Sequence, residues 1–304
     1  MSGSAAFDAF LRTAPSLEGL LTQVARAAAA DASVLILGPA GSGRSSLARA
    51  VHQASSRRRQ PLVEVDIAAI PSTLFESEFF GFEAGAFTGA DRSSPGRALR
   101  AEGGTMILDH VEELPLASQP KLLRLLAERR FQPLGGKDRK ADIRFVAIGA
   151  ADLERRVEQG SFRADLYYRL EVLTFSLPAL ARRKSDFSAI FDYFLDDLSA
   201  RTGRGDLRLT DRALRWMLQY GWPGNLRQVR NVLERAVIAQ PRAVALDPPP
   251  PADVTRPPRS LADTEQEAIL AALAHTRGHQ GRAAELLGIS RKTLWEKRKR
   301  YRIP

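Results

Sequence analysis

The chain has 304 residues, of which 44 % are hydrophobic, with a formal net charge of +10 and no cysteine. This length suggests about two domains, and the lack of cysteine excludes disulfides, cysteine zinc sites and cysteine nucleophiles. We find no run of about 18 apolar residues that would predict a membrane-spanning helix, and no secretory signal at the start. We therefore expect a cytoplasmic protein that does not bind a membrane, and the four histidines show no metal-ligand spacing.

Short apolar runs alternate with helical stretches in the first part of the chain. Runs of this length are typical of buried parallel strands, and helical patterns such as Lys121–Arg130 lie between several of them. The alternation predicts an α/β fold with a parallel sheet. The expected strands are Ser33–Leu37, Leu62–Asp66, Thr105–Leu108, Ile143–Ile148 and Leu173–Leu177.

The first of these runs leads into a phosphate-binding pattern, GPAGSGRS. Glycines let backbone amides fold around phosphates at the start of a helix, and in the usual pattern a lysine reaches the β- and γ-phosphates while a hydroxyl holds magnesium. Here Arg44 replaces the lysine and keeps its charge with a larger, planar group. A structural glycine turn is the alternative, but the flanking strand and helix favour a nucleotide. The predicted ligand-binding residues are Gly38, Gly41, Ser42, Gly43, Arg44 and Ser45.

After Leu177 the strand patterns stop, and Ser185–Thr202 and Thr210–Gln240 are expected to form a helical subdomain. A proline-rich stretch, Pro241–Pro258, is typical of an extended linker, and the rest of the chain is helical again. The expected domains are an α/β subdomain at 1–177, a helical lid at 178–240, a linker at 241–259 and a DNA-binding domain at 260–304.

The last segment combines positive charge with a helix-turn-helix pattern. Nine Lys and Arg residues stand against two glutamates between Arg277 and Arg302, which indicates a polyanionic partner. Thr264–His275 has the spacing of a packing or dimer helix; a tight turn is then expected at Gly288, with Ser290 as N-cap of the second helix. This pattern resembles the Fis-type DNA-binding domain. The residues expected to contact duplex DNA are Ser290, Arg291, Lys292, Thr293, Lys297 and Arg298.

A second motif identifies a family. The sequence GAFTGA at Gly85–Ala90, together with Phe162–Leu170 and Trp222–Arg227 in the same order, resembles the sigma-54-dependent activators, or bacterial enhancer-binding proteins. The resemblance runs from about residue 20 to residue 239 and implies an AAA+ module that binds ATP with magnesium. It also implies a contact between the GAFTGA loop and sigma-54 RNA polymerase. The residues expected to make that contact are Gly85, Ala86, Phe87, Thr88, Gly89 and Ala90.

The resemblance assigns roles to four further residues. Arg163 and Arg169 match the arginine fingers that enter a neighbouring subunit's ATP site, where an arginine stabilises the transferred phosphoryl group. Arg227 matches the second sensor, and Asp109 matches the acidic residue that, with Ser45, holds magnesium. Because each site needs two subunits, the resemblance implies a homo- or hetero-oligomeric ring.

Four positions depart from the family pattern. Besides Arg44, His110 replaces the water-polarising glutamate, Asp66 replaces its asparagine partner, and Ala150 replaces the first-sensor asparagine. These changes suggest weak or lost hydrolysis, so the enzymatic activity stays open. Alternatively, an aspartate that orients a neutral imidazole is a workable general base, in which case Asp66 and His110 compensate each other.

Three functional hypotheses follow. The first is a sigma-54-dependent regulator that binds ATP and upstream DNA. The second is a hydrolysis-deficient subunit that acts in a mixed ring with a competent paralogue, and the third is a DNA-binding repressor with a vestigial motor. About 20 residues precede the AAA+ pattern without a sensing domain, so a regulatory partner protein is a further expectation.

Overall fold

The computed structural model describes residues 7, 10, 12–250, 265, 269–270, 272–273, 276 and 279–301. Contacts divide the chain into two compact units, Met1–Pro250 and Pro251–Pro304. Residues 251–259 of the expected linker and parts of the expected helix at Thr264–His275 lie outside the described residues. No helix among the described residues is long and apolar enough to cross a membrane.

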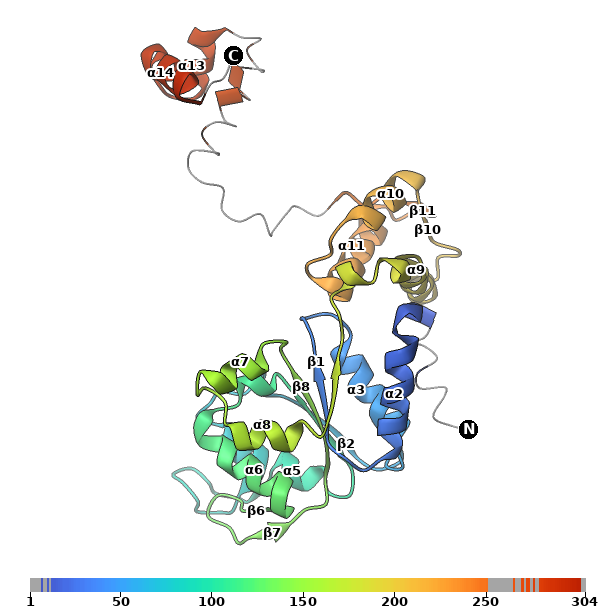
Figure 1. Ribbon diagram of the computed structural model, residues 1–304, viewed down its shortest axis with the longest axis vertical. Helices are drawn as coiled ribbons and strands as arrows, with labels where there is room; N and C mark the ends of the chain where they lie inside the picture. The colour runs from blue at the N-terminus through green and yellow to red at the C-terminus, as the bar shows by residue number, and fades with distance from the viewer. Residues whose placement is uncertain are drawn as a thin grey trace. The chain divides into compact units, whose positions relative to one another are not determined.

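The first unit is built on a five-stranded parallel sheet with the strand order β2-β5-β8-β1-β9, which confirms the predicted fold class (Figure 1). Every residue of the central strand β8 is buried, as expected for a parallel strand covered on both faces. The strands of this sheet are β1 (Val34–Leu37), β2 (Leu62–Asp66), β5 (Thr105–Asp109), β8 (Arg144–Gly149) and β9 (Leu173–Ser176).

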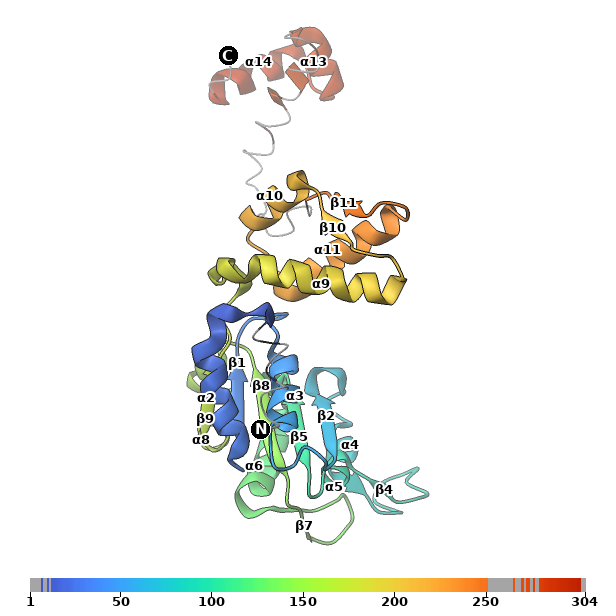
Figure 2. The same cartoon turned by 90° about the vertical axis from the view of Figure 1, so that its right-hand side faces the viewer.

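Helices cover both faces of the sheet (Figure 2). Side chains alternate along a strand, so Val34 and Ile36 of β1 pack in one hydrophobic cluster with α2 and α3, whereas Leu35 belongs to the cluster on the opposite face. The first face is covered by α2 (Glu18–Ala29) and α3 (Arg44–Gln53), and the second by α4 (Phe75–Phe80), α5 (Arg97–Arg100), α6 (Gln119–Glu128), α7 (Leu153–Glu158) and α8 (Ala164–Leu170).

Two short hairpins and several 3-10 turns complete the α/β part. Strands β3 and β4 pair antiparallel, as do β6 and β7. These elements are β3 (Gly81–Phe82), β4 (Ser94–Pro95), β6 (Arg130–Phe131), β7 (Arg139–Lys140), η1 (Pro15–Leu17), η2 (Ile67–Ala69), η3 (Val111–Glu113), η4 (Leu116–Ser118), η5 (Leu180–Arg182) and η6 (Lys184–Asp186).

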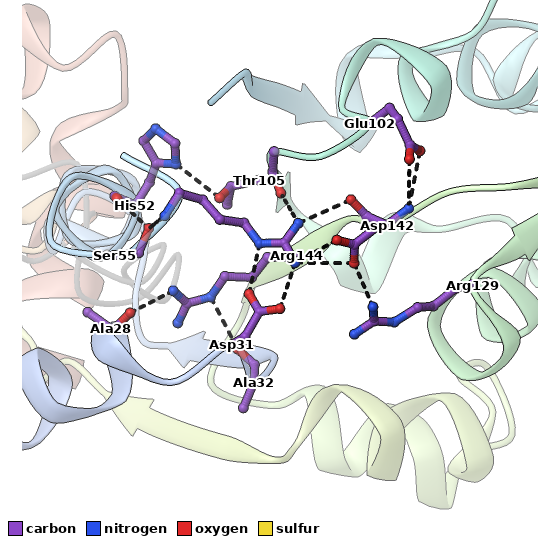
Figure 3. Close-up of polar contacts among 12 residues, drawn as sticks. Ala28, Asp31, Ala32, His52, Ser55, Glu102, Thr105, Arg129, Asp142 and Arg144 are labelled. Carbon is purple, nitrogen blue, oxygen red and sulfur yellow. Dashed lines mark hydrogen bonds and ion pairs between the residues drawn. The ribbon is translucent and has the colours of Figure 1, made fainter. Parts of the chain in front are cut away.

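A buried arginine ties helix α2 to the sheet at the end opposite the phosphate loop. Arg144, at the start of β8, is 2 % exposed and donates to the carbonyls of Ala27 and Ala28 in the last turn of α2 and to that of Ala32 after the helix. Figure 3 shows its side chain reaching towards Ala28 and Ala32. The last carbonyls of a helix have no partner within the helix, so Arg144 caps α2 and fixes it against β8.

The lid consists of three helices and two short strands around Trp222, which is 1 % exposed. The expectation that Thr210–Gln240 is helical is wrong in one respect, because the chain is not helical between Gln219 and Asn225, so that two helices form. Trp222 has a positive φ of 47° and precedes a proline, which disfavours α-helical backbone before it. The elements are α9 (Phe187–Thr202), α10 (Asp211–Gln219), α11 (Asn225–Ala239), β10 (Arg208–Leu209) and β11 (Ala245–Leu246).

The second unit contains α13 (Gln280–Leu286) and α14 (Arg291–Tyr301) around a small apolar core. Gly288 takes a positive φ of 66° between them, and the Thr293 N–H donates to Ser290 Oγ. The predicted glycine turn and serine N-cap are therefore both present.

Candidate functional site

A cleft of about 590 Å³ lies beside the loop that joins β1 to α3. Its walls come from this loop, from the ends of β5 and α3, and from lid helices α9 and α11. The cleft therefore combines the carboxyl end of a parallel sheet with a helix N-terminus, the usual place for a phosphorylated ligand. Its lining residues include Phe10, Gly41, Gly43, Arg44, Ser45, Arg49, Asp109, His110, Tyr193, Phe194, Leu226, Arg227 and Arg230.

The phosphate loop has room only for glycine where the chain turns. Gly41 has a φ of +74°, and a Cβ there would lie 2.6 Å from the Gly224 carbonyl oxygen of the lid. Gly38 is equally confined, since a Cβ would lie 2.6 Å from the Leu177 carbonyl oxygen. The loop is thus packed against both the sheet and the lid, which holds its backbone in one shape.

Arg44 does not extend freely into the cleft. It is 7 % exposed, and its Nη1 donates to the carbonyl oxygen of Gly38 at 2.8 Å and to that of Gly149 at the end of β8. Gly149 directly precedes Ala150, the position at which the family resemblance predicted an asparagine. In this structure the arginine therefore ties the phosphate loop to the neighbouring strand.

Two polar pairs form at the carboxyl end of the sheet. Ser45 Oγ donates to Asp109 Oδ2 at 2.9 Å, which puts two oxygen ligands of the kind that magnesium prefers side by side. His110 Nδ1 lies 2.8 Å from Asp66 Oδ1, and the backbone N–H of His110 donates to Asp109 Oδ1 at 3.0 Å. The structure therefore brings together all four of these predicted residues, from α3, β2, the end of β5 and the residue that follows it.

The lid makes contacts with the phosphate loop that sequence reasoning missed. Arg227 lines the cleft, as predicted, but its neighbours Asn225 and Leu226 bond to the loop itself. Asn225 Nδ2 donates to the Ala40 carbonyl, and the Leu226 N–H donates to the Gly41 carbonyl. The one local signal was an asparagine at a helix start after Pro-Gly, a residue that tolerates positive φ.

Arg163 directly precedes helix α8, and Arg169 lies near the end of the same helix. Neither residue lines this cleft. Arg163 pairs with Asp165 at 2.8 Å, and this guanidinium lowers the pKa of the Asp165 carboxyl below its usual value. Arg169 Nη2 donates to the Leu126 carbonyl at 3.3 Å. Both side chains are exposed, as a contact with another subunit would require.

The predicted sigma-54 contact forms an exposed loop between β3 and β4. The Gly85 N–H donates to the Ala90 carbonyl at 2.8 Å and closes the loop, and Ala90 is buried at its base. Phe87 is 47 % exposed and its ring lies 4.9 Å from that of Phe82. An apolar side chain is thus held at the surface with about half of its area exposed.

The second unit divides the predicted DNA-binding residues between two sides of α14. Arg291 and Lys292 are exposed, whereas Lys297 pairs with Glu265 and the Nε of Arg298 is buried. Trp295, which the sequence analysis did not single out, is 57 % exposed beside Arg291 and Lys292, with Lys299 Nζ 5.5 Å from its ring centre.

Comparisons with known proteins agree with this organisation. The chain matches the family models "Sigma-54 interaction domain" over residues 10–176, "AAA+ ATPase lid domain" over 181–248 and "Bacterial regulatory protein, Fis family" over 260–301.

Its relatives include the transcriptional regulatory protein ZraR of Salmonella typhimurium, which is 39 % identical over 97 % of this chain and 69 % of ZraR. The regulatory protein AtoC of Escherichia coli is 37 % identical over 96 % of this chain and 68 % of AtoC. Among solved structures, NtrX from Brucella abortus in complex with ATP is 32 % identical, with a TM-score of 0.73 over 93 % of this chain and 67 % of NtrX. These similarities favour the first functional hypothesis over the mixed-ring and repressor alternatives.

Proposed function

Since the chain belongs to the sigma-54 activator family and is a sigma-54-dependent transcription regulator, we propose that its nucleotide cleft hydrolyses ATP and thereby controls the Gly85–Ala90 loop. The observation that carries this proposal is the arrangement of Ser45, Asp109, His110 and Asp66 beside the phosphate loop. Nucleotide binding itself agrees with the family and with the ATP complex of NtrX.

The cleft suits a triphosphate with magnesium. Loop amides and the start of α3 present positive partial charge to the phosphates. The Ser45 hydroxyl and the Asp109 carboxylate fit magnesium, which would neutralise charge on the β- and γ-phosphates. Arg227 and Arg230, from the lid, add two cations to the same cleft.

In the proposed reaction His110 acts as general base. Its Nδ1 faces Asp66, which leaves Nε2 for a water molecule, because the carboxylate favours the tautomer with the proton on Nδ1. The water oxygen forms a bond to the γ-phosphorus, the bond from that phosphorus to the β,γ-bridging oxygen breaks, and the water proton passes to Nε2. Asp66 stabilises the imidazolium that forms.

We further propose a ring in which Arg163 and Arg169 serve the cleft of the adjacent subunit. Both arginines are exposed and away from the cleft of their own chain. An arginine supplied in trans stabilises charge on the transferred phosphoryl group. The ring would carry the Gly85–Ala90 loops to sigma-54, while α14 binds upstream DNA through Arg291, Lys292 and Trp295.

The test is ATP turnover by the purified full chain. General-base catalysis contributes about 10²- to 10⁴-fold, so His110→Ala should lower turnover by at least about 100-fold while ATP still binds in calorimetry. The double variant Asp66→Asn/His110→Glu restores the asparagine–glutamate pair of the family pattern and should recover turnover. The control is His279→Ala, in the second unit. Unchanged turnover in His110→Ala would contradict the assignment.

A further inference from the structure

Asn225 is the one described residue whose side chain bonds to the phosphate loop and to the segment that enters the lid. It is 2 % exposed and stands at the start of α11 with a φ of +52°. Its Nδ2 donates to the Ala40 carbonyl at 2.9 Å, and its Oδ1 accepts from the Leu180 N–H at 2.7 Å. Leu180 begins η5, which follows the last strand of the sheet and precedes the first lid helix.

The chemistry of the two partners fixes the orientation of this amide. One partner is a carbonyl, which only accepts, and the other is an N–H, which only donates. Turning the amide over would place its NH₂ against the Leu180 N–H and its oxygen against the Ala40 carbonyl. Both contacts would then be lost in a buried place where an unpaired polar group is costly.

The Ala40 contact reaches the phosphate-binding atoms. The peptide group between Ala40 and Gly41 is planar and trans, so the Ala40 C=O and the Gly41 N–H lie in the same plane and point in opposite directions. Asn225 therefore sets the direction of the Gly41 amide, which belongs to the phosphate loop. The Leu226 N–H holds the next carbonyl, that of Gly41, at 3.0 Å.

The entry segment touches the loop at a second point. Arg183, which follows η5, is 3 % exposed and its Nη2 donates to the Ser42 carbonyl at 3.4 Å. Burial lowers the pKa of Arg183. Three consecutive loop carbonyls, those of Ala40, Gly41 and Ser42, are thus held by the lid or by its entry segment.

From this geometry we propose that Asn225 is a positioning residue that couples nucleotide occupancy of the phosphate loop to the lid. A phosphate that turns the Ala40–Gly41 peptide pulls on the amide of Asn225, and the same side chain passes the change to the Leu180 N–H. The inference rests on the proposed function in one respect, because it requires a nucleotide in this cleft.

The experiment is hydrogen exchange of the full chain by mass spectrometry, with and without saturating ATP. In the wild type, ATP should slow exchange in both the loop at 38–45 and the entry segment at 178–183. Asn225→Asp keeps the acceptor for Leu180 and removes the donor to Ala40. In this variant ATP should still slow exchange in the loop but no longer in the entry segment. ATP should also bind about fivefold more weakly, because one hydrogen bond is lost.

Asn225→Ala removes both the donor to the Ala40 carbonyl and the acceptor for the Leu180 N–H. In that variant the Leu180 amide should therefore also exchange faster without nucleotide, a change that we do not expect in Asn225→Asp. The matched control is Asn231→Asp, the same substitution at an exposed position of the same helix, which should behave as wild type. If the entry segment still responds to ATP in Asn225→Asp, or in Asn225→Ala should the first variant fail to fold, the coupling is refuted. Failure of the wild type to bind ATP would instead refute the proposed function, and the inference with it.

Discussion

At the scale of single residues, Arg44 determines how this phosphate loop differs from the usual one. Its guanidinium is buried and donates to the carbonyls of Gly38 and Gly149, so the side chain joins the phosphate loop to strand β8. A smaller residue at position 150 accompanies this arrangement.

Arg44→Lys should tighten ATP binding, because a lysine at this position of the usual pattern reaches the β- and γ-phosphates, whereas Arg44 donates from Nη1 to the carbonyls of Gly38 and Gly149. We expect about a tenfold lower Kd in calorimetry, or about 1.4 kcal/mol. Arg44→Met, which removes both the hydrogen bonds and the charge, serves as the control and should not improve binding. A Kd that rises equally in both variants would show that Arg44 already contacts the phosphates.

At the scale of elements, the parts predicted from sequence are those whose signal is local. The five strands, the phosphate loop and the turn at Gly288 each depend on the order of neighbouring residues. The bond from Asn225 to Ala40 joins residues 185 positions apart, and nothing in hydrophobic periodicity encodes such a contact. The same holds for Trp295, whose exposure depends on how α14 packs on α13.

The cap on α2 is a second long-range feature and has a measurable effect on stability. Arg144→Met should destabilise the first unit by about 2–4 kcal/mol, because the Ala27 and Ala28 carbonyls in the last turn of α2 and the Ala32 carbonyl after it lose the Arg144 guanidinium as a donor. Chemical denaturation measures this change. Arg129→Met is the control, since Arg129 is 61 % exposed and pairs with Asp142 at the surface, where a salt bridge contributes about 0–1 kcal/mol. Equal losses in the two variants would contradict the capping role.

At the scale of the whole molecule, two parts with different chemistry share one chain. The first unit holds the nucleotide cleft and the exposed Gly85–Ala90 loop, and the second presents cations and Trp295 on one helix. Within the first unit the cleft and the Gly85–Ala90 loop lie on different elements of the same α/β layer. If nucleotide controls the Gly85–Ala90 loop, occupancy of the cleft must change how that loop meets sigma-54.

The most direct test is the binding of purified sigma-54 to the full chain, measured without nucleotide and with ADP–aluminium fluoride as an analogue of the hydrolytic transition state. We expect that sigma-54 is retained with the analogue and not without nucleotide. We also expect that Thr88→Ala abolishes retention, while the control Thr73→Ala, at another exposed threonine, does not. Equal retention with and without the analogue, or full retention by Thr88→Ala, would contradict the claim that nucleotide controls this loop.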